Sequence, residues 1–216
     1  MLLDLLFPNR CLHCNRIIDA EDVVCDACLG MINFTHWSYG EQNPMLQKCK
    51  AMFPTENAYA LIHFEKGGLS QKIIHELKYR GREKIGKIFS AWIFERVNFG
   101  ENKPDLLVNI PLHPKKEKER GYNQLHLLTE ELSNLYKIPY DHNILKRNFY
   151  KKPQARKNKT ERMIETNLFS LNKKIENQHL LIIDDVMTTG NTLSSVAWEL
   201  LKSGNNKVSV LTIAVD

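Results

Sequence analysis

Residues Leu180 to Thr192 constrain the fold of this chain more than any other stretch. They read Leu-Leu-Ile-Ile-Asp-Asp-Val-Met-Thr-Thr-Gly-Asn-Thr. Four aliphatic residues followed by two carboxylates predict a buried parallel strand that emerges at its carboxyl end. The small residues after it predict a turn, and the apolar spacing from Leu193 to Leu201, closed by Gly204, predicts a helix. The stretch therefore favours an α/β fold in which a strand leads through a small-residue loop into a helix.

A strand, loop and helix in this order can hold a phosphate. The N–H groups of the first helical turn have no intrahelical partner and lie at the positive end of the helix dipole. Gly190 would let the phosphate approach the backbone, and the threonine hydroxyls of the loop would add donors. Asp184 and Asp185, at the rim of the loop, could accept hydrogen bonds from the hydroxyls of an attached sugar. The alternative is a buried strand whose two acids only cap the next turn.

The chain is long enough for one sizeable core with a small appendage. Its 216 residues are 43% hydrophobic and 25% charged, which is ordinary for a globular protein. The net charge of +5 favours polyanionic ligands without naming one. The N-terminus carries Asp4, has no basic leader, and no run approaches the roughly 20 apolar residues of a membrane span. We therefore expect a soluble protein of the cytoplasm.

Four of the five cysteines form two Cys-x-x-Cys pairs near the N-terminus. They are Cys11, Cys14, Cys25 and Cys28. Two such pairs can close a tetrahedral thiolate site, so residues 1–32 are predicted to be a structural zinc module. An iron–sulfur cluster or a redox dithiol is the weaker alternative, because a redox dithiol gives no reason for two pairs. A segment this short and polar buries too little to fold without its metal.

The remaining chain is predicted to hold a linker at 33–56 and one α/β domain at 57–216. The expected strands are 58–64, 106–110, 180–183 and 208–215, and the expected helices centre on the apolar spacings at 73–77, 85–97, 125–135 and 193–201. The loop after the second of these strands ends in Arg120-Gly-Tyr-Asn-Gln124 at a helix start. A solvated charged loop explains Lys115 to Glu119 but explains Arg120 to Gln124 less easily.

Residues Lys146 to Arg162 carry eight basic residues against one acid, Glu161. No helical or strand period is present before Thr160, and long polar loops of compact domains are commonly functional, so we predict a mobile lid. Its cations could close over a pyrophosphate. They could also follow a nucleic-acid backbone, with Phe149 and Tyr150 as stacking surfaces. A merely solvated loop is the remaining alternative.

The stretch from Leu180 to Thr192 resembles the binding motif of the type I phosphoribosyltransferases. The resemblance implies that the loop holds the 5-phosphate of phosphoribosyl pyrophosphate, through Thr188, Thr189, Gly190, Asn191 and Thr192. It also implies that Asp184 and Asp185 hold the ribose hydroxyls, and that Mg²⁺ accompanies the ligand. The predicted pyrophosphate residues, from the Arg-Gly loop and the lid, are Arg120, Gly121, Tyr122, Asn123, Lys152, Arg156, Lys159 and Arg162.

The whole set of motifs is similar to the ComF family. It consists of the cysteine pairs, Leu77-Lys-Tyr-Arg-Gly81, Arg120 to Gln124, Gln154 to Arg162 and the 180–192 stretch. The resemblance implies a zinc module joined to a phosphoribosyltransferase-like domain, and a role in handling imported single-stranded DNA during natural transformation, with DNA-uptake or recombination proteins as partners. Two hypotheses stay open: a phosphoribosyltransferase of unknown acceptor, and a non-catalytic DNA-binding adaptor or sensor. The predicted nucleic-acid residues are Lys78, Tyr79, Arg80, Phe149, Tyr150, Lys151, Lys152, Arg156 and Lys157.

Overall fold

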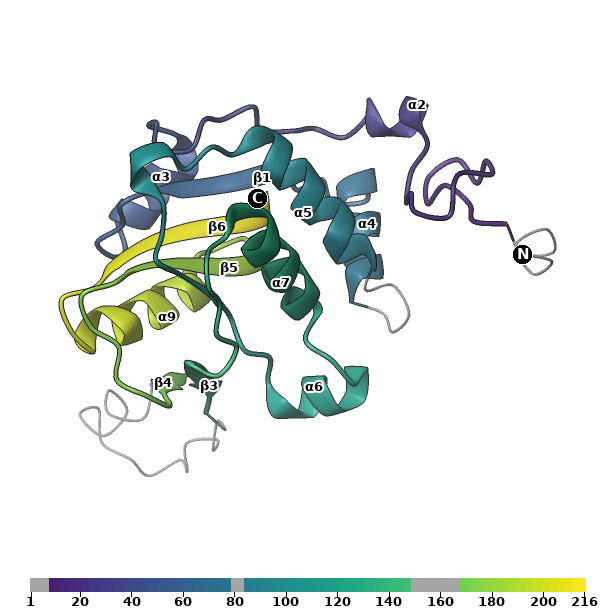
Figure 1. The fold of residues 1–216 in the computed structure, drawn as a ribbon. Coiled ribbons are helices and arrows are strands. Elements are labelled where there is room, and N and C mark those ends of the chain that lie inside the picture. Colours follow the sequence, from purple (N-terminus) through teal and green to yellow (C-terminus); the bar gives the residue numbers. More distant parts are fainter. Residues whose placement is uncertain (1–7, 79–83, 149–167) are drawn as a thin grey trace, which may run out of the picture.

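A four-stranded parallel sheet forms the centre of the molecule (Figure 1). The computed structural model describes residues 8–78, 84–148 and 168–216. The strands, in their order across the sheet, are β1 (Ala58–His63), β6 (Lys207–Val215), β5 (His179–Met187) and β2 (Leu106–Asn109). Their near-continuous apolar runs arise because both faces of the sheet are covered. The predicted α/β fold with a parallel sheet is confirmed.

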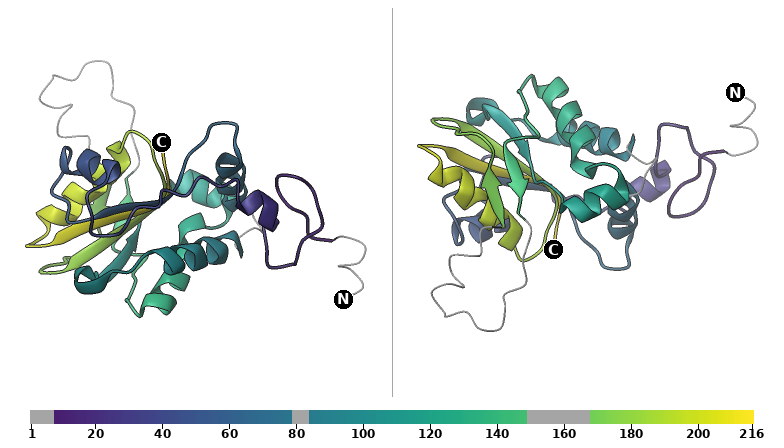
Figure 2. Two further views of the ribbon diagram at one scale, coloured as in Figure 1. Left: turned by 90° about the horizontal axis from the view of Figure 1, so that it is seen from above. Right: turned by 90° about the horizontal axis from the view of Figure 1, so that it is seen from below.

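Helices cover the two faces of the sheet (Figure 2). On one face, α5 (Lys84–Arg96) packs along α7 (Gln124–Tyr136), with α4 (Leu69–Leu77) beside α5. On the other face lie α9 (Asn191–Lys202) and α3 (Pro44–Lys50). In the four longest helices described, the buried residues recur at three- and four-residue spacing, as the sequence predicts, although Phe94, Leu135 and Trp198 are exposed.

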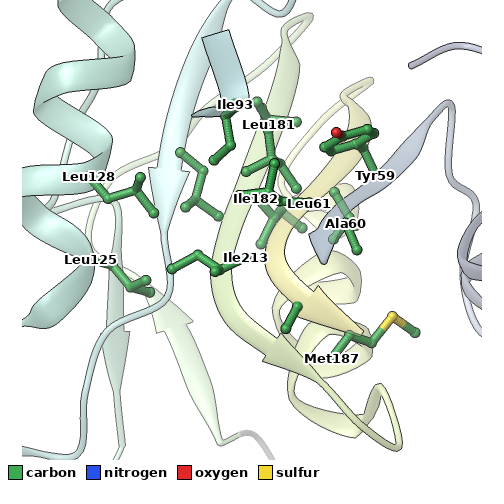
Figure 3. Packing of buried hydrophobic residues seen from close by; sticks show 14 of the residues in the cluster. Tyr59, Ala60, Leu61, Ile93, Leu125, Leu128, Leu181, Ile182, Met187 and Ile213 are labelled. Atoms are coloured by element: carbon green, nitrogen blue, oxygen red, sulfur yellow. The ribbon is translucent and has the colours of Figure 1, made fainter. Parts of the chain in front are cut away.

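The core lies between the sheet and the α5–α7 pair and continues under α9 (Figure 3). Leu125 and Leu128 of α7 and Ile93 of α5 are fully buried. Leu181 and Ile182, neighbours on β5, are buried on opposite faces because successive strand residues alternate. All four residues from Leu180 to Ile183 are therefore apolar because the strand is buried on both faces of the sheet.

The strand order reverses between β2 and β5. After β2 the chain passes through α7 to Tyr140, which bridges Leu107 in parallel on the outer side of β2. The chain later returns to β5 on the other side of β2, and α9 connects β5 to β6. The loops after β2 and β5 therefore diverge toward opposite faces. In open α/β sheets, ligands bind in the crevice that such a reversal leaves at the carboxyl ends of the strands.

Several short elements were not expected from the sequence. Helix α6 (Pro114–Arg120) occupies the run that reads as a solvated charged loop; Lys115 to Glu119 are exposed, as that alternative expects, but they form a helix and not a loop. The side chain of His113 caps its start and Gly121, at φ 83°, ends it. Helix α3 is also unexpected, since it lies within the predicted linker at 33–56. Further short elements are η1 (Gly100–Asn102), β3 (Leu145–Arg147) and β4 (Phe169–Leu171), the last two forming an antiparallel pair.

The N-terminal module extends from one side of the sheet (Figure 1). The short helix α2 (Asp26–Leu29) lies near the C-terminal end of this module. It is attached at the β1 edge, where Phe34 forms an antiparallel bridge with Ile62. Thr35 Oγ1 donates to the carbonyl of Ala60 at 2.6 Å. Within the described ranges, none of the helices has the length and apolar character to cross a membrane.

Candidate functional site

The loop after β5 has the conformation that a phosphate site needs. Gly190 is the N-cap of α9 and lies at φ 83°, where a side chain is strained. A Cβ at this position would also crowd the end of the Met52 side chain, which would have to move. The N–H groups in the first turn of the 12-residue α9 have no intrahelical acceptor and carry the positive end of its dipole. The loop can therefore bind a phosphate.

Asp184 and Asp185 lie inside β5, which continues to Met187 rather than ending at the acids. Because successive side chains of a strand point to alternate faces of the sheet, the two carboxylates lie on opposite faces. The Asp184 Oδ1 atom accepts from the N–H of Asp185 at 2.9 Å, and Asp185 Oδ1 accepts from the N–H of Val186 at 2.8 Å. These bonds fix both carboxylates close to the strand.

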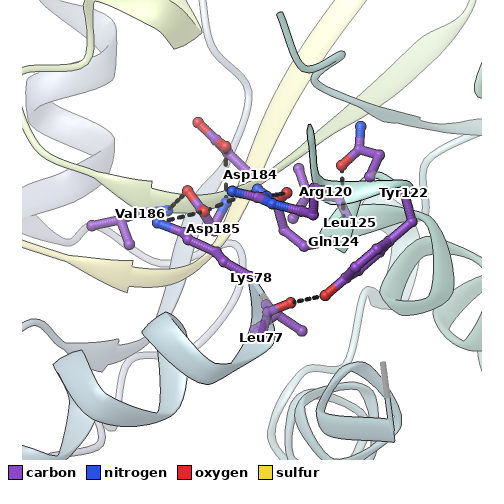
Figure 4. Close-up of polar contacts among 10 residues, drawn as sticks. Leu77, Lys78, Arg120, Tyr122, Gln124, Leu125, Asp184, Asp185 and Val186 are labelled. Atoms are coloured by element: carbon purple, nitrogen blue, oxygen red, sulfur yellow. Dashed lines mark hydrogen bonds and ion pairs between the residues drawn. The ribbon is translucent and has the colours of Figure 1, made fainter. Parts of the chain in front are cut away.

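Asp185 is joined to two other elements (Figure 4). Lys78, just after α4, places its Nζ atom 3.2 Å from Asp185 Oδ2, and Gln124 Nε2 donates to the same oxygen at 3.1 Å. The Arg120 guanidinium in turn donates to Gln124 Oε1. The sequence predicted Lys78 for nucleic acid and did not single out Gln124 as a site residue. The contacts now place both at the acidic pair.

The Arg-Gly-Tyr-Asn segment is held in place by its own hydrogen bonds. The Tyr122 hydroxyl donates to the carbonyl of Leu77 at 2.9 Å. The buried Asn123 caps α7 by accepting from the N–H of Leu125 at 3.0 Å, and its amide donates to the carbonyl of Ile110 at 3.1 Å. Tyr122 and Asn123 therefore position Arg120, and their side chains are used within the protein.

A cavity of about 530 Å³ adjoins this network. Lys78 and Arg120 line it and also connect it to Asp185, directly or through Gln124. Four of the seven described lining residues are lysine or arginine, which suits a polyanion. The lining residues are His75, Lys78, Lys116, Lys118, Glu119, Arg120 and Gly121. Lys116 lies one helical turn before Arg120, so α6 brings to one face two cations that the sequence pattern did not pair.

A second cavity, of about 360 Å³, lies at the opposite edge of the sheet, where the strands begin. Its lining includes the carboxylates of Glu56, Glu101 and Asp105, with Lys207 as the basic residue. Excess negative charge makes this cavity a poor place for a phosphate. Charge therefore favours the carboxyl edge, where the Gly190 loop and the first cavity lie.

The pKa of Asp184 is raised from 3.8 to about 8. The main cause is burial of the carboxyl group, and the second is the neighbouring Asp185 carboxylate. Between about pH 4 and pH 8 the native state therefore binds more protons than the unfolded state. The free energy of unfolding then falls as the pH rises through this window.

Asp184→Asn should remove that fall, so the variant gains stability over the original protein from pH 4 to pH 8. Urea unfolding at a series of pH values measures this, and parallel pH curves for the two proteins would contradict it.

The four paired cysteines converge as the sequence predicts. Their sulfur atoms all lie within 4.8 Å of one another, and the Cys14 and Cys25 sulfurs are 3.6 Å apart. Four thiolates at this spacing fit a single tetrahedral zinc ion. Cys49 lies elsewhere, fully buried, with its Sγ atom 3.9 Å from Met187 Sδ.

Several predicted site residues lie outside the described residues. They are Tyr79, Arg80, Phe149, Tyr150, Lys151, Lys152, Arg156, Lys157, Lys159 and Arg162. The predicted lid is wrong at its start, because Lys146 and Arg147 lie in strand β3, paired with β4, and not in a loop. For residues 149–162 the lid stays a prediction from sequence.

Two domain families match this sequence. The double zinc ribbon domain matches residues 2–42, which contain the four cysteines, and the phosphoribosyl transferase domain matches residues 126–215, which contain β5, the Gly190 loop and α9. Lys78, Arg120 and Gln124 lie outside both matches, whereas Asp185, which Lys78 and Gln124 contact, lies within the second.

Curated relatives share this pair of domains or part of it. Over 140 residues, 63% of this chain and 55% of that protein, the chain is 35% identical to competence protein ComFC of Bacillus subtilis. It is 26% identical over 213 residues to DNA utilization protein YhgH of Escherichia coli, covering 93% of this chain and 87% of that protein. It is 25% identical over 227 residues to competence protein F of Haemophilus influenzae, covering 96% and 97%.

These matches support the sequence-based assignment to the ComF family. This protein combines a zinc-ribbon module with a phosphoribosyltransferase-like α/β domain, as the sequence predicts. Its match to ComFC spans little more than half of that relative.

Proposed function

We propose that this protein binds phosphoribosyl pyrophosphate at the carboxyl edge of the sheet. The observation that carries the proposal is the Gly190 loop at the start of α9, placed beside two strand carboxylates and a cavity rich in cations. The loop would hold the 5-phosphate with its amides and threonine hydroxyls. Asp184 and Asp185 would accept from the ribose hydroxyls, and the cavity would receive the pyrophosphate.

The same arrangement would serve transfer of the phosphoribosyl group. The bond from the anomeric carbon to pyrophosphate breaks as an acceptor attacks, and positive charge develops on the sugar. Asp185 would stabilise this charge, joined by Asp184 when that carboxyl group is ionised, while Arg120, Lys78 and the lysines of α6 would stabilise the departing pyrophosphate. Bound Mg²⁺ would neutralise part of the pyrophosphate charge, mainly through ligand oxygens and water. Residues Lys152, Arg156, Lys159 and Arg162 are proposed to complete the pyrophosphate site.

Titration calorimetry of the full chain with phosphoribosyl pyrophosphate tests the proposal. About one ligand per chain should bind, more tightly with Mg²⁺ than without it. Absence of binding in zinc-loaded, folded protein contradicts it. Exchange of labelled pyrophosphate into the ligand, screened across candidate base acceptors, then separates a transferase from a binding protein, because only turnover produces exchange.

A second proposed function is the handling of single-stranded DNA in the cytoplasm during natural transformation. The relatives named for competence and for DNA utilization support it, together with the basic run from Lys146 to Arg162. Cations with adjacent aromatic residues suit an unpaired strand, because backbone charge and exposed bases are met together. DNA-uptake or recombination proteins are the corresponding proposed partners.

We predict that the affinity for single-stranded DNA falls with salt, with a log–log slope of about −0.7 for each phosphate neutralised. Replacing Lys151, Lys152, Arg156 and Lys157 by alanine should flatten that slope in fluorescence anisotropy titrations. The matched control removes the same charge from four exposed lysines elsewhere, namely Lys66, Lys72, Lys103 and Lys202. Equal slopes for the two variants would show that total charge, and not this segment, binds DNA.

A further inference from the structure

The segment before β1 forms one wall of the phosphate loop. Helix α3 is anchored on the sheet by the buried Met45, Leu46 and Cys49. Asn43 caps the helix by accepting from the N–H of Leu46 at 2.8 Å and donates to the carbonyl of Ala58 at 2.8 Å. These contacts fix α3 relative to β1, so its exposed side chains have defined positions at the loop.

Two contacts join the end of this segment to the loop and to α9. The Met52 side chain occupies the space next to Gly190 that a Cβ would fill. The indole N–H of Trp198, on α9, donates to the carbonyl of Met52 at 3.1 Å. The segment around α3 is therefore packed against the same loop that starts α9, on the face where α9 lies (Figure 2).

Lys48 reaches the loop from α3. Its Nζ atom donates to the carbonyl of Thr188 at 2.5 Å, across 140 residues of sequence. An ammonium group has three N–H donors, and this carbonyl takes one of them. The residue is exposed, so its remaining donors are accessible to a ligand at the loop.

We propose that Lys48 is a further ligand-binding residue, which contacts the phosphate held by Thr188 to Thr192. This inference rests on the proposed function of the loop. The loop itself offers neutral donors, namely backbone amides and threonine hydroxyls, whereas a sugar phosphate carries close to two negative charges. An ammonium group at the first residue of the loop supplies the opposite charge. The ligand site then includes a residue from the segment between the two matched domains.

A purely structural role is the competing explanation, in which Lys48 only ties α3 to the loop. The two roles differ in which ligand they affect. A residue that contacts the 5-phosphate acts on ribose 5-phosphate and on phosphoribosyl pyrophosphate, and leaves inorganic pyrophosphate unaffected. A structural tie alters the melting temperature and shows no preference among the ligands.

The test compares Lys48→Met, Lys48→Arg and Lys50→Met in the full chain by titration calorimetry. Lys50 is an exposed lysine of the same helix, two residues away. We expect Lys48→Met to lose about tenfold or more in affinity for both sugar phosphates, because a hydrogen bond to a charged group is lost. Pyrophosphate affinity should stay within about twofold, Lys48→Arg should retain most of the affinity, and Lys50→Met should match the original protein.

Three outcomes would overturn the inference. The first is an unchanged affinity of Lys48→Met for ribose 5-phosphate while the original protein binds it. The second is an equal loss for pyrophosphate, which assigns Lys48 a structural role. The third is that the original protein binds neither sugar phosphate, in which case the proposed function fails as well. This outcome is recognised from the original protein alone, before any variant is measured.

Discussion

Replacing Asp184 and Asp185 together by asparagine is expected to weaken the binding of phosphoribosyl pyrophosphate by about 100-fold or more. Hydrogen bonds to charged groups contribute roughly 1.5–3 kcal/mol each, and 1.4 kcal/mol corresponds to a factor of ten in affinity. The change also removes the carboxylate that holds Lys78 and Gln124 at the strand. Since asparagine has nearly the same shape, the strand and its core contacts should be kept. Titration calorimetry with Mg²⁺ measures the effect.

A matched control for this variant is Asp141→Asn. Asp141 is a carboxylate that pairs with Lys173 and lies outside the network of Asp185. It should leave ligand affinity unchanged. A double variant that stays folded and binds as tightly as the original protein would show that the pocket is wrongly assigned.

Replacing any one of Cys11, Cys14, Cys25 or Cys28 by serine should remove the zinc and unfold the N-terminal module. Apart from its ligands, the module buries few large apolar residues, among them Val23, Val24 and Ile32. Metal binding therefore supplies most of its folding free energy. Metal analysis should change from about one zinc per chain to nearly none, and limited proteolysis should cut within residues 8–30. The larger domain should keep its unfolding transition.

Cys49→Ser is the control for the zinc prediction. Cys49 is buried beside Met187 and belongs to the α/β domain. The variant should keep its zinc, although it can lower the stability of the core. Two results would refute the assignment. One is original protein that contains no zinc although it was never exposed to a chelator, and the other is a variant of one of the four cysteines that retains full zinc.

The elements around the loop could be predicted because each carries a strong local signal. The aliphatic run of β5 and the apolar spacing of α9 are periodic over many residues, and Gly190 marks the only sharp change between them. Helix α6 carries no such signal. Its seven residues are almost all charged, so it has no apolar face, and it is bounded by the His113 cap and by Gly121. The three-residue strands β3 and β4 are too short to show a period of two.

The contacts within the site could not be predicted for a different reason. Gln124 reaches Asp185 across 61 residues, and Lys48 reaches Thr188 across 140 residues. A single sequence shows the chemistry of each residue and carries no local signal of which distant residue it meets. Lys78 illustrates this, since its basic and aromatic neighbours suggested a surface for nucleic acid. The fold places its ammonium at an acidic strand.

Amide hydrogen exchange of the full chain, with and without phosphoribosyl pyrophosphate and Mg²⁺, tests the central claim most directly. Ligand bound at the proposed site should slow exchange in residues 188–194, whose amides would donate to the phosphate, and in residues 120–125. Exchange in the zinc module at 9–30 and at the opposite edge of the sheet, at 176–179, should be unchanged. If the ligand binds and exchange in residues 188–194 is not slowed, the account is contradicted.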